Sequence, residues 1–238
     1  EKKLAVKLKA KSIGLKHYRL KIETDHKDKN HLNNEFDFFV DIIDDRQKIL
    51  LVYDTPHPDI GCIKQIFLNK DNIKLDIINY KDIKTKNSVK KYDLVVLYQL
   101  PSKDNGLIKN DKLFEGLPKF YIIGNNSDLL KLNKLQNSIS CRASSQSSNE
   151  VHTSLVNDFS LFQISDGLKD FLANAPPLIS PFSDYKKLQG HVLMYQKING
   201  IKTGYPLLTI NSGINKEAIL MGEGIWRWRI NEFLYHNS

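Results

Sequence analysis

Asp54, His57 and Asp59 form a compact group of titratable residues that could carry out chemistry. They follow the apolar run at residues 49–53 (ILLVY), which predicts a strand buried on both faces of a sheet. In open α/β sheets, ligands bind beyond the carboxyl ends of such strands. Two carboxylates and an imidazole there could serve as acid and base or hold a divalent metal. A structural role is favoured, because two prolines stiffen the turn, Asp59 can cap the next helix, and no second His/Asp cluster supplies ligands.

A second candidate is the turn at Asn125 and Asn126, between a strand-like run at residues 121–123 and a helical pattern. In several α/β enzymes such a strand-to-helix turn carries a Cys or Ser nucleophile. Asn cannot serve as that nucleophile, but it tolerates left-handed backbone and its amide could contribute to an oxyanion-type pocket. An ordinary turn in which Ser127 caps the helix is the favoured interpretation.

The third candidate is Glu223 with Arg227 and Arg229, in the segment GEGIWRWR at residues 222–229. Two guanidinium groups could clamp a carboxylate or phosphate, and the neighbouring tryptophans allow cation–π stacking. If the segment is extended, the two Trp share one face and the two Arg the other. The favoured alternative is an ion-paired domain edge covered by aromatic side chains. Walker, GxGxxG, GxSxG and HExxH motifs are absent from the sequence.

The charge and cysteine content argue against several classes of function. The net charge of +8 comes from 30 Lys against 5 Arg, scattered among acidic residues. Nucleic-acid recognition favours clustered Arg or basic runs, so no nucleic-acid partner is predicted. Cys62 and Cys141 fit no zinc spacing and no CxxC motif, and we predict neither a metal nor a cofactor. The sequence has no membrane-spanning run and no signal-peptide pattern, and its abrupt strand-like start suggests a fragment of a longer protein.

Two domains are predicted. In residues 1–46, alternating apolar residues indicate three antiparallel strands, at residues 4–8, 18–22 and 36–42. Three strands are too few to close a sandwich, so we expect a partial immunoglobulin-like β segment. Its open edges should pack on the second domain or on another copy of the chain, which would make a homo-oligomer.

Residues 47–238 are predicted to form an α/β domain. Strand-like runs at residues 49–53, 73–78, 94–98 and 121–123, with helical patterns between them, indicate a doubly wound, flavodoxin-like parallel sheet. Residues 143–149 (ASSQSSN) are expected to form a mobile loop. Further strands at residues 191–198, 206–210 and 218–221, the first two joined by a turn at Asn199 and Gly200, predict an antiparallel hairpin extension.

Four segments together resemble one known group: KILLVYDTPHPDIGCIKQIF, YDLVVLYQLPS, KFYIIGNNSD and GEGIWRWR. They are similar to the class I glutamine-amidotransferase-like domain of uncharacterised bacterial envelope proteins. The resemblance covers residues 48–230, GEGIWRWR being the most specific part, and NNEFDFFVDIID is similar to the end of the preceding immunoglobulin-like domain. It implies a periplasmic domain in the bacterial cell envelope, belonging to a membrane-anchored parent, with protein partners in the envelope or in the parent chain itself.

Active class I amidotransferases carry a nucleophilic Cys in a Gly-x-Cys-x-Gly elbow and a later His-x-Glu pair. The corresponding elbow here is Gly124-Asn125-Asn126-Ser127, neither cysteine falls there, and His-x-Glu occurs nowhere. Thiolate attack on glutamine needs both the Cys and a base. The resemblance therefore predicts a non-catalytic scaffold or binding module.

Two alternatives stay open at this point. One is a hydrolase that uses Asp54, His57 and Asp59, with or without a divalent metal. The other is a binding site for a small anion between Arg227 and Arg229, which requires both guanidinium groups to face one concavity.

Overall fold

The computed structural model describes residue 5 and residues 7–8, 12–21, 34–68, 70–83, 85–104, 112–142 and 147–236. The chain divides into two compact units, Glu1–Arg46 and Gln47–Ser238. The candidate site residues all belong to the larger unit.

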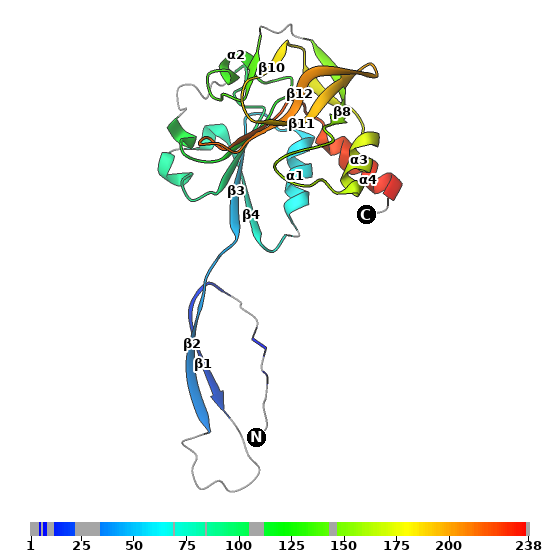
Figure 1. The fold of residues 1–238 in the computed structure, drawn as a ribbon. Helices are drawn as coiled ribbons and strands as arrows, with labels where there is room; N and C mark the ends of the chain where they lie inside the picture. The colour runs from blue at the N-terminus through cyan, green and yellow to red at the C-terminus, as the bar shows by residue number, and fades with distance from the viewer. Residues whose placement is uncertain are drawn as a thin grey trace. The chain divides into compact units, whose positions relative to one another are not determined.

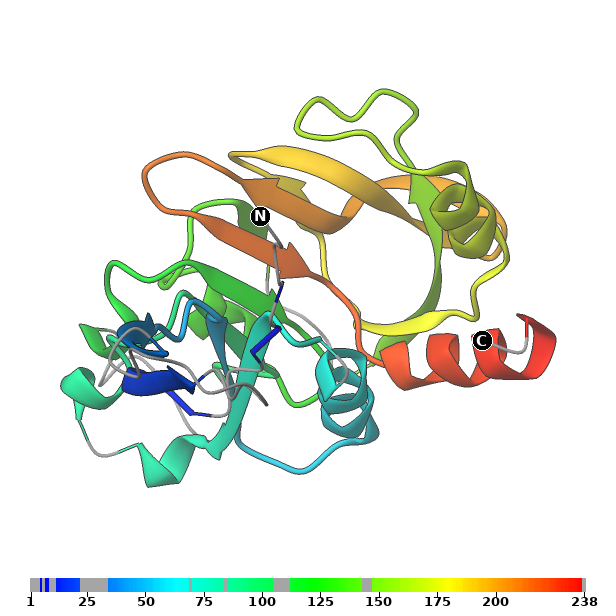
Figure 2. The same ribbon diagram turned by 90° about the horizontal axis from the view of Figure 1, so that it is seen from below.

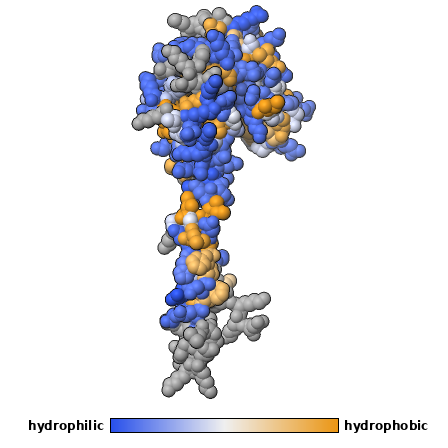
Figure 3. Space-filling view, turned by 90° about the vertical axis from the view of Figure 1, so that its left-hand side faces the viewer, coloured by the Kyte–Doolittle hydropathy of each residue, from blue (hydrophilic) through white to orange (hydrophobic). Residues whose placement is uncertain are grey.

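The smaller unit contains an antiparallel hairpin of β1 (Gly14–Lys21) and β2 (Glu35–Ile42) (Figure 1). One face is largely apolar, with Tyr18 stacked on Phe38, and Figure 3 shows apolar side chains along the hairpin. The other face carries the Arg19–Asp37 ion pair at 2.9 Å. Of the strand predicted at residues 4–8, positions 4 and 6 lie outside the described residues, and Leu8 is not in a strand. The immunoglobulin-like assignment stays a prediction.

The larger unit is built on one nine-stranded mixed sheet, in the order β4-β3-β5-β6-β13-β12-β11-β8-β9. Its first five strands are parallel. Counted along the chain their order is 2-1-3-4-5, one of the common orders of parallel α/β sheets. All four predicted parallel strands are present. The five are β3 (Gln47–Tyr53), β4 (Ile73–Asn79), β5 (Leu94–Tyr98), β6 (Lys119–Ile122) and β13 (Glu217–Leu220).

The strand predicted at residues 218–221 was assigned to the wrong part of the sheet. It is β13, which pairs parallel with β6 and antiparallel with β12, so that it belongs to the parallel series. A short buried apolar run indicates a strand but carries no information about its direction.

The antiparallel part contains β8 (Ser148–Leu155), β9 (Leu178–Pro181), β11 (His191–Ile198) and β12 (Ile201–Asn211). The predicted hairpin is confirmed: Asn199 and Gly200 both have positive φ, 49° and 80°, as a tight two-residue turn requires. The loop predicted at residues 143–149 is wrong at its end, because β8 begins at Ser148; residues 143–146 lie outside the described residues. A separate two-stranded sheet joins β7 (Ile139–Cys141) to β10 (Tyr185–Lys187).

Two hydrophobic clusters lie against the sheet. One contains Leu50 and Leu97 together with Leu129 and Leu132. The other contains Leu51 and Val96 with side chains from the three longer helices. The helices are α1 (Pro58–Leu68), α2 (Leu129–Leu132), α3 (Asp166–Asn174) and α4 (Ile225–His236), and the link from β4 to β5 contains two 3₁₀ turns, η2 (Tyr80–Asp82) and η3 (Lys86–Ser88). Helices α1 and α4 contact each other (Figure 2). Within the described ranges, no helix is long and apolar enough to cross a membrane.

Candidate functional site

The carboxyl ends of the parallel strands bring most of the candidate residues to one edge of the sheet. Asp54 comes directly after β3, Gly124 two residues after the end of β6, and Glu223 three residues after the end of β13. Tyr98 ends β5, and Gln99 comes next. This edge is where ligands bind in related sheets, so it is the first place to look for chemistry.

Asp59 is the best-connected residue at this edge. Its side chain is fully buried, and its carboxylate accepts hydrogen bonds from the backbone N–H of Gly224 at 2.7 Å and of Trp226 at 2.8 Å. It also accepts one from the Tyr98 hydroxyl at 2.9 Å. Asp59 was predicted to cap the helix that follows it, α1. Its side chain instead bonds to the start of α4, so that the carboxylate joins two segments distant in sequence.

His57 is held beside this carboxylate through its Nδ1 atom. Nδ1 lies 2.5 Å from the Tyr98 hydroxyl oxygen, and it accepts a hydrogen bond from the Asp59 backbone N–H at 3.2 Å. The polar contacts of His57 with described residues therefore all use Nδ1.

Glu223 and Gln99 form a second group at the same edge. The Gln99 side-chain amide donates a short hydrogen bond to Glu223 Oε2, and the Gln99 carbonyl oxygen accepts from the Asn126 backbone N–H at 3.1 Å. Two backbone hydrogen bonds with Ile179, each 2.9 Å, fix the position of Glu223. Gln99 has φ of 51°, a strained value for a non-glycine residue. A strained residue of this kind persists only where its surroundings hold it.

The Glu223 carboxyl is nearly fully buried, 8% exposed. Burial raises the pKa of Glu223 above its ordinary value, while nearby His57, the Asn125 backbone N–H and Gln99 act to lower it and Asp59 to raise it. The charged form of Glu223 is therefore less favourable in the folded protein than in water.

This raised pKa makes a prediction about stability. Between the ordinary pKa of glutamate, about 4.3, and the raised folded-state pKa, the folded protein binds more protons than the unfolded chain. Glu223 therefore lowers the free energy of unfolding as the pH rises through that window. We expect the free energy of unfolding of Glu223→Gln, relative to that of the wild type, to be higher at pH 7 than at pH 4. Urea unfolding at the two pH values measures this difference. The exposed Glu150→Gln is the control, and a Glu223→Gln difference that is the same at both pH values would contradict the prediction.

Asp54 does not join His57 and Asp59. Its carboxylate accepts a hydrogen bond from the Ser102 hydroxyl at 2.8 Å and lies 3.9 Å from the Lys81 ammonium group. The described residues contain no group of three His, Cys, Asp or Glu side chains that could hold a metal ion. Sequence proximity had suggested one cluster, but the turn directs Asp54 and Asp59 to different partners.

The turn after β6 differs from its predicted form. Among the described residues, the only non-glycine residues with positive φ are Gln99 and Asn199, so Asn125 and Asn126 do not adopt left-handed backbone. Ser127 does not cap the helix: its hydroxyl accepts from the Gly124 N–H at 3.1 Å, and Asp128 is the N-cap of α2. The Asn125 N–H points to Glu223 Oε2, at 3.4 Å. The N–H groups of Gly124 and Asn125 are thus hydrogen-bonded within the protein.

Arg227 and Arg229 lie in helix α4, not in an extended segment. Residues two apart on a helix point about 200° away from each other, so the pair does not form a clamp on one face. Arg227 packs over the Trp226 ring and donates to the Pro177 carbonyl at 3.4 Å, whereas Arg229 is exposed. Trp228 donates its indole N–H to the Pro176 carbonyl at 2.7 Å.

Sequence reasoning missed Tyr98, Gln99 and Ser102. All three lie at or just after the end of β5, a strand that was predicted at the correct residues. Applying the rule about carboxyl ends of parallel strands to this strand would have found them.

Comparisons with known proteins concern the fold. No protein-family profile matches the chain, and no curated protein sequence matches it significantly. Among solved structures it is similar to a glutamine amidotransferase from Thermotoga maritima, at 17% identity and a TM-score of 0.44, over 79% of this chain and 82% of the other. A putative ThuA-like protein from Bacteroides uniformis gives 13% identity and a TM-score of 0.44, over 79% of this chain and 90% of the other.

A β-galactosidase from Rahnella sp. R3 gives 13% identity and a TM-score of 0.45 over 79% of this chain. The chain spans only 30% of that enzyme's length. Likeness at this level concerns the mixed α/β fold alone, and the neighbours include a glutamine amidotransferase.

Proposed function

We propose that residues 47–238 form a non-catalytic module with a doubly wound, amidotransferase-like fold that acts as a scaffold or binding domain. One observation carries this proposal: the polar groups at the carboxyl edge bond mainly to one another. Asp59 accepts three hydrogen bonds from the protein, and Gln99 links Glu223 to the turn after β6. Groups engaged in this way stabilise the fold, and a catalytic acid or base would in addition have to lie within hydrogen-bond reach of a substrate.

The two cysteines support the same proposal. Cys62 lies on α1 and is buried, and both burial and the Asp59 carboxylate raise the pKa of its thiol. Cys141 lies on β7, and burial raises the pKa of its thiol to about 12. Both are free thiols and neither is in the turn after β6. A nucleophilic cysteine needs a lowered pKa and access to substrate.

The cellular setting is proposed from the resemblance of the sequence. We propose a bacterial envelope location, in a membrane-anchored parent, with protein partners in the envelope or in the parent chain. Several large apolar residues of the β1–β2 hairpin are exposed, among them Leu15, Phe36 and Phe39, and an open, partly apolar hairpin suits packing against another β segment.

Thiol chemistry tests the proposal directly. We expect Cys62 and Cys141 of the native full chain to react slowly with a thiol reagent, because little thiolate is present near neutral pH, and to react fast once the protein is unfolded in urea. Glutamine should not be hydrolysed by the native chain. A rapid reaction of one native thiol, together with glutamine turnover that disappears in Cys62→Ala or Cys141→Ala, would contradict a non-catalytic role.

A hydrolase remains the second candidate, for a specific reason. Gln99, with its strained backbone, and Glu223, whose carboxyl has a raised pKa, lie side by side at the edge of the sheet. Strained backbone and perturbed pKa values gather at functional sites as well as in structural networks. In this version the acid and base would be Glu223 and His57, in place of the Asp54, His57 and Asp59 group.

A further inference from the structure

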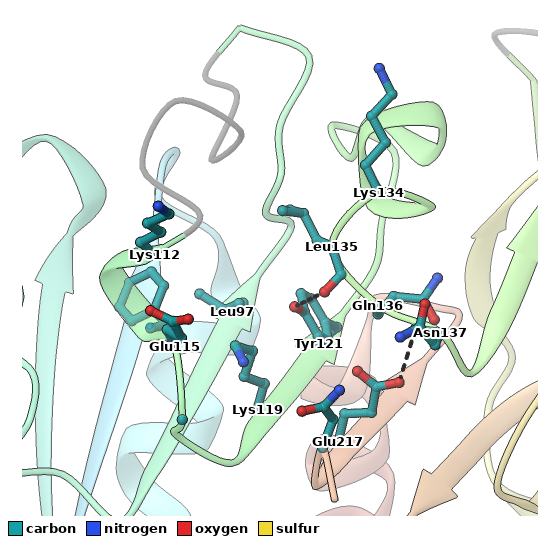
Figure 4. A pocket seen from close by; sticks show the side chains of 13 residues that line it. Leu97, Lys112, Glu115, Lys119, Tyr121, Lys134, Leu135, Gln136, Asn137 and Glu217 are labelled. Carbon is teal, nitrogen blue, oxygen red and sulfur yellow. Dashed lines mark hydrogen bonds between the residues drawn. The ribbon is translucent and has the colours of Figure 1, made fainter.

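A separate cavity of about 270 Å³ opens at the other end of the parallel strands, beside the first residues of β6 and β13 (Figure 4). Its lining is mixed in charge. It includes Lys119 and Glu217 from the strands, and Lys112, Lys134 and Asn137 from the connections around them. None of these residues takes part in the network around Asp59 and Glu223, so the cavity is a site of its own.

Lys119 and Glu217 are direct cross-strand partners. They face each other in the parallel pairing of β6 and β13, and residues paired in this way place their side chains on the same face of the sheet. No ion pair within 4.0 Å joins them in the part of the chain that the structure describes. Two opposite charges on neighbouring strands thus line the cavity without forming an ion pair with each other.

Neither charge is fully compensated by the protein. Glu217 is 7% exposed; its Oε1 atom accepts from the Asn137 N–H at 3.2 Å and, in a short bond, from the Ser138 hydroxyl. Within the described residues its Oε2 atom has no hydrogen-bond donor, and Figure 4 shows that oxygen on the side of Lys119. Among the residues that the structure describes, the Lys119 ammonium group donates one hydrogen bond, to the Leu117 carbonyl at 3.3 Å.

The partial burial of Lys119 has an electrostatic consequence. Burial lowers the pKa of Lys119, and the carboxylates of Glu217 and Glu115 act in the opposite direction. A desolvated ammonium group gains most from a ligand that brings a negative charge into the cavity. At the entrance the exposed Lys112 and Lys134 outnumber the exposed Glu115, which favours the same kind of ligand.

We propose that this cavity binds a small zwitterion of amino-acid size, with its carboxylate at Lys119 and its ammonium group at the free oxygen of Glu217. A simple anion would meet the Glu217 carboxylate, and a simple cation would meet Lys119. A ligand that carries both charges compensates both. The volume lies just below the range of drug-sized pockets, which fits a small metabolite.

Two-dimensional ¹H–¹⁵N NMR of the full chain tests this site, with L-alanine as the probe and acetate and ethylammonium as its single-charge halves. At about 10 mM, where a ligand with a millimolar Kd is mostly bound, we expect L-alanine to shift the amide signals of Lys119, Asn137 and Glu217. Acetate and ethylammonium should shift them much less. If acetate shifts them as strongly as L-alanine, the cavity is a simple anion site and the proposal is wrong; the absence of shifts with L-alanine would also overturn it.

Charge-removing variants sharpen the test. In Lys119→Gln and in Glu217→Gln, the amide shifts that L-alanine causes should be at least tenfold smaller than in the wild type. In Lys187→Gln, on the exposed part of β10, these shifts should be unchanged. Glu217→Gln retains an oxygen for the Asn137 N–H, and without the carboxylate it should gain a response to acetate. Full L-alanine binding in both cavity variants would overturn the proposal. Since the cavity is separate from the carboxyl edge, its failure would leave the non-catalytic proposal untouched.

Discussion

Asp59→Asn is expected to lower the free energy of unfolding by about 3 kcal/mol, because charge-assisted hydrogen bonds to buried donors are lost. The carboxylate accepts from the N–H groups of Gly224 and Trp226 and from the Tyr98 hydroxyl. An asparagine keeps one oxygen, and its NH₂ group would face at least one of these donors. The substitution therefore leaves a buried donor without an acceptor, although it changes the side-chain volume very little. Urea unfolding measures the loss.

Asp170→Asn, on the exposed side of α3, is the matched control and should change stability little. Asp59→Ala should cost at least as much as Asp59→Asn, since it removes both acceptor oxygens that hold the start of α4. An Asp59→Asn variant as stable as the control would show that the Asp59 network is not a main support of the fold.

Gly124→Ala is the second substitution with a large expected effect. A Cβ atom at this position would lie 2.0 Å from Glu223 Oε2 and 3.0 Å from the Gln99 side-chain carbon Cδ. Such crowding forces the buried Gln99–Glu223 pair to move and should cost about 2 kcal/mol. The comparison is Gly167→Ala in α3, where no atom of the described residues lies within 4 Å of the added Cβ. That variant should be stabilised by about 0.5 to 1 kcal/mol, because alanine favours helix over glycine.

A double-mutant cycle identifies the cause of the Gly124→Ala effect. In a Glu223→Ala background the nearest clash is removed, so Gly124→Ala should cost at least about 1 kcal/mol less than in the wild type. The free energy of unfolding of the two single variants and the double variant gives the coupling directly. Additive costs would mean that Glu223 does not fill the space behind the turn.

The strand positions could be predicted from the sequence because each has a local signal. Residues 49–53 and 94–98 are continuous apolar runs, and both are buried strands in the structure. The direction of β13 could not be predicted in this way, because its neighbours on the two sides are far away in the chain.

Helix α4 shows why the end of the chain was harder to predict. Trp226 and Trp228 alternate with two arginines, a period of two that is typical of a strand, although the segment is helical. The helix has no Ser, Thr, Asp or Asn just before Ile225 to cap it. The N–H of Trp226 in its first turn and the N–H of Gly224 just before it donate to Asp59, 167 residues away from Trp226 in the sequence. A cap supplied from so far away leaves no mark in the local sequence.

The candidate site was predicted only in part for a similar reason. The predicted strand ends place His57, Asp59 and Glu223 near one edge of the sheet, and these residues are linked there through Tyr98 and Gln99. The sequence could not show that Asp54 turns to Ser102, or that the strained residue is Gln99 and not Asn125. These details depend on partners that only the folded chain brings together.

The most direct test of the central claim is a hydrolysis assay of the full chain on L-glutamine and on an activated ester, with His57→Ala and Glu223→Gln beside the wild type. If these side chains only stabilise the fold, all three folded proteins should hydrolyse both substrates no faster than buffer alone does. A wild-type turnover well above buffer, lost in His57→Ala or Glu223→Gln while both variants remain folded, would show that the carboxyl edge is an active site and would contradict the account.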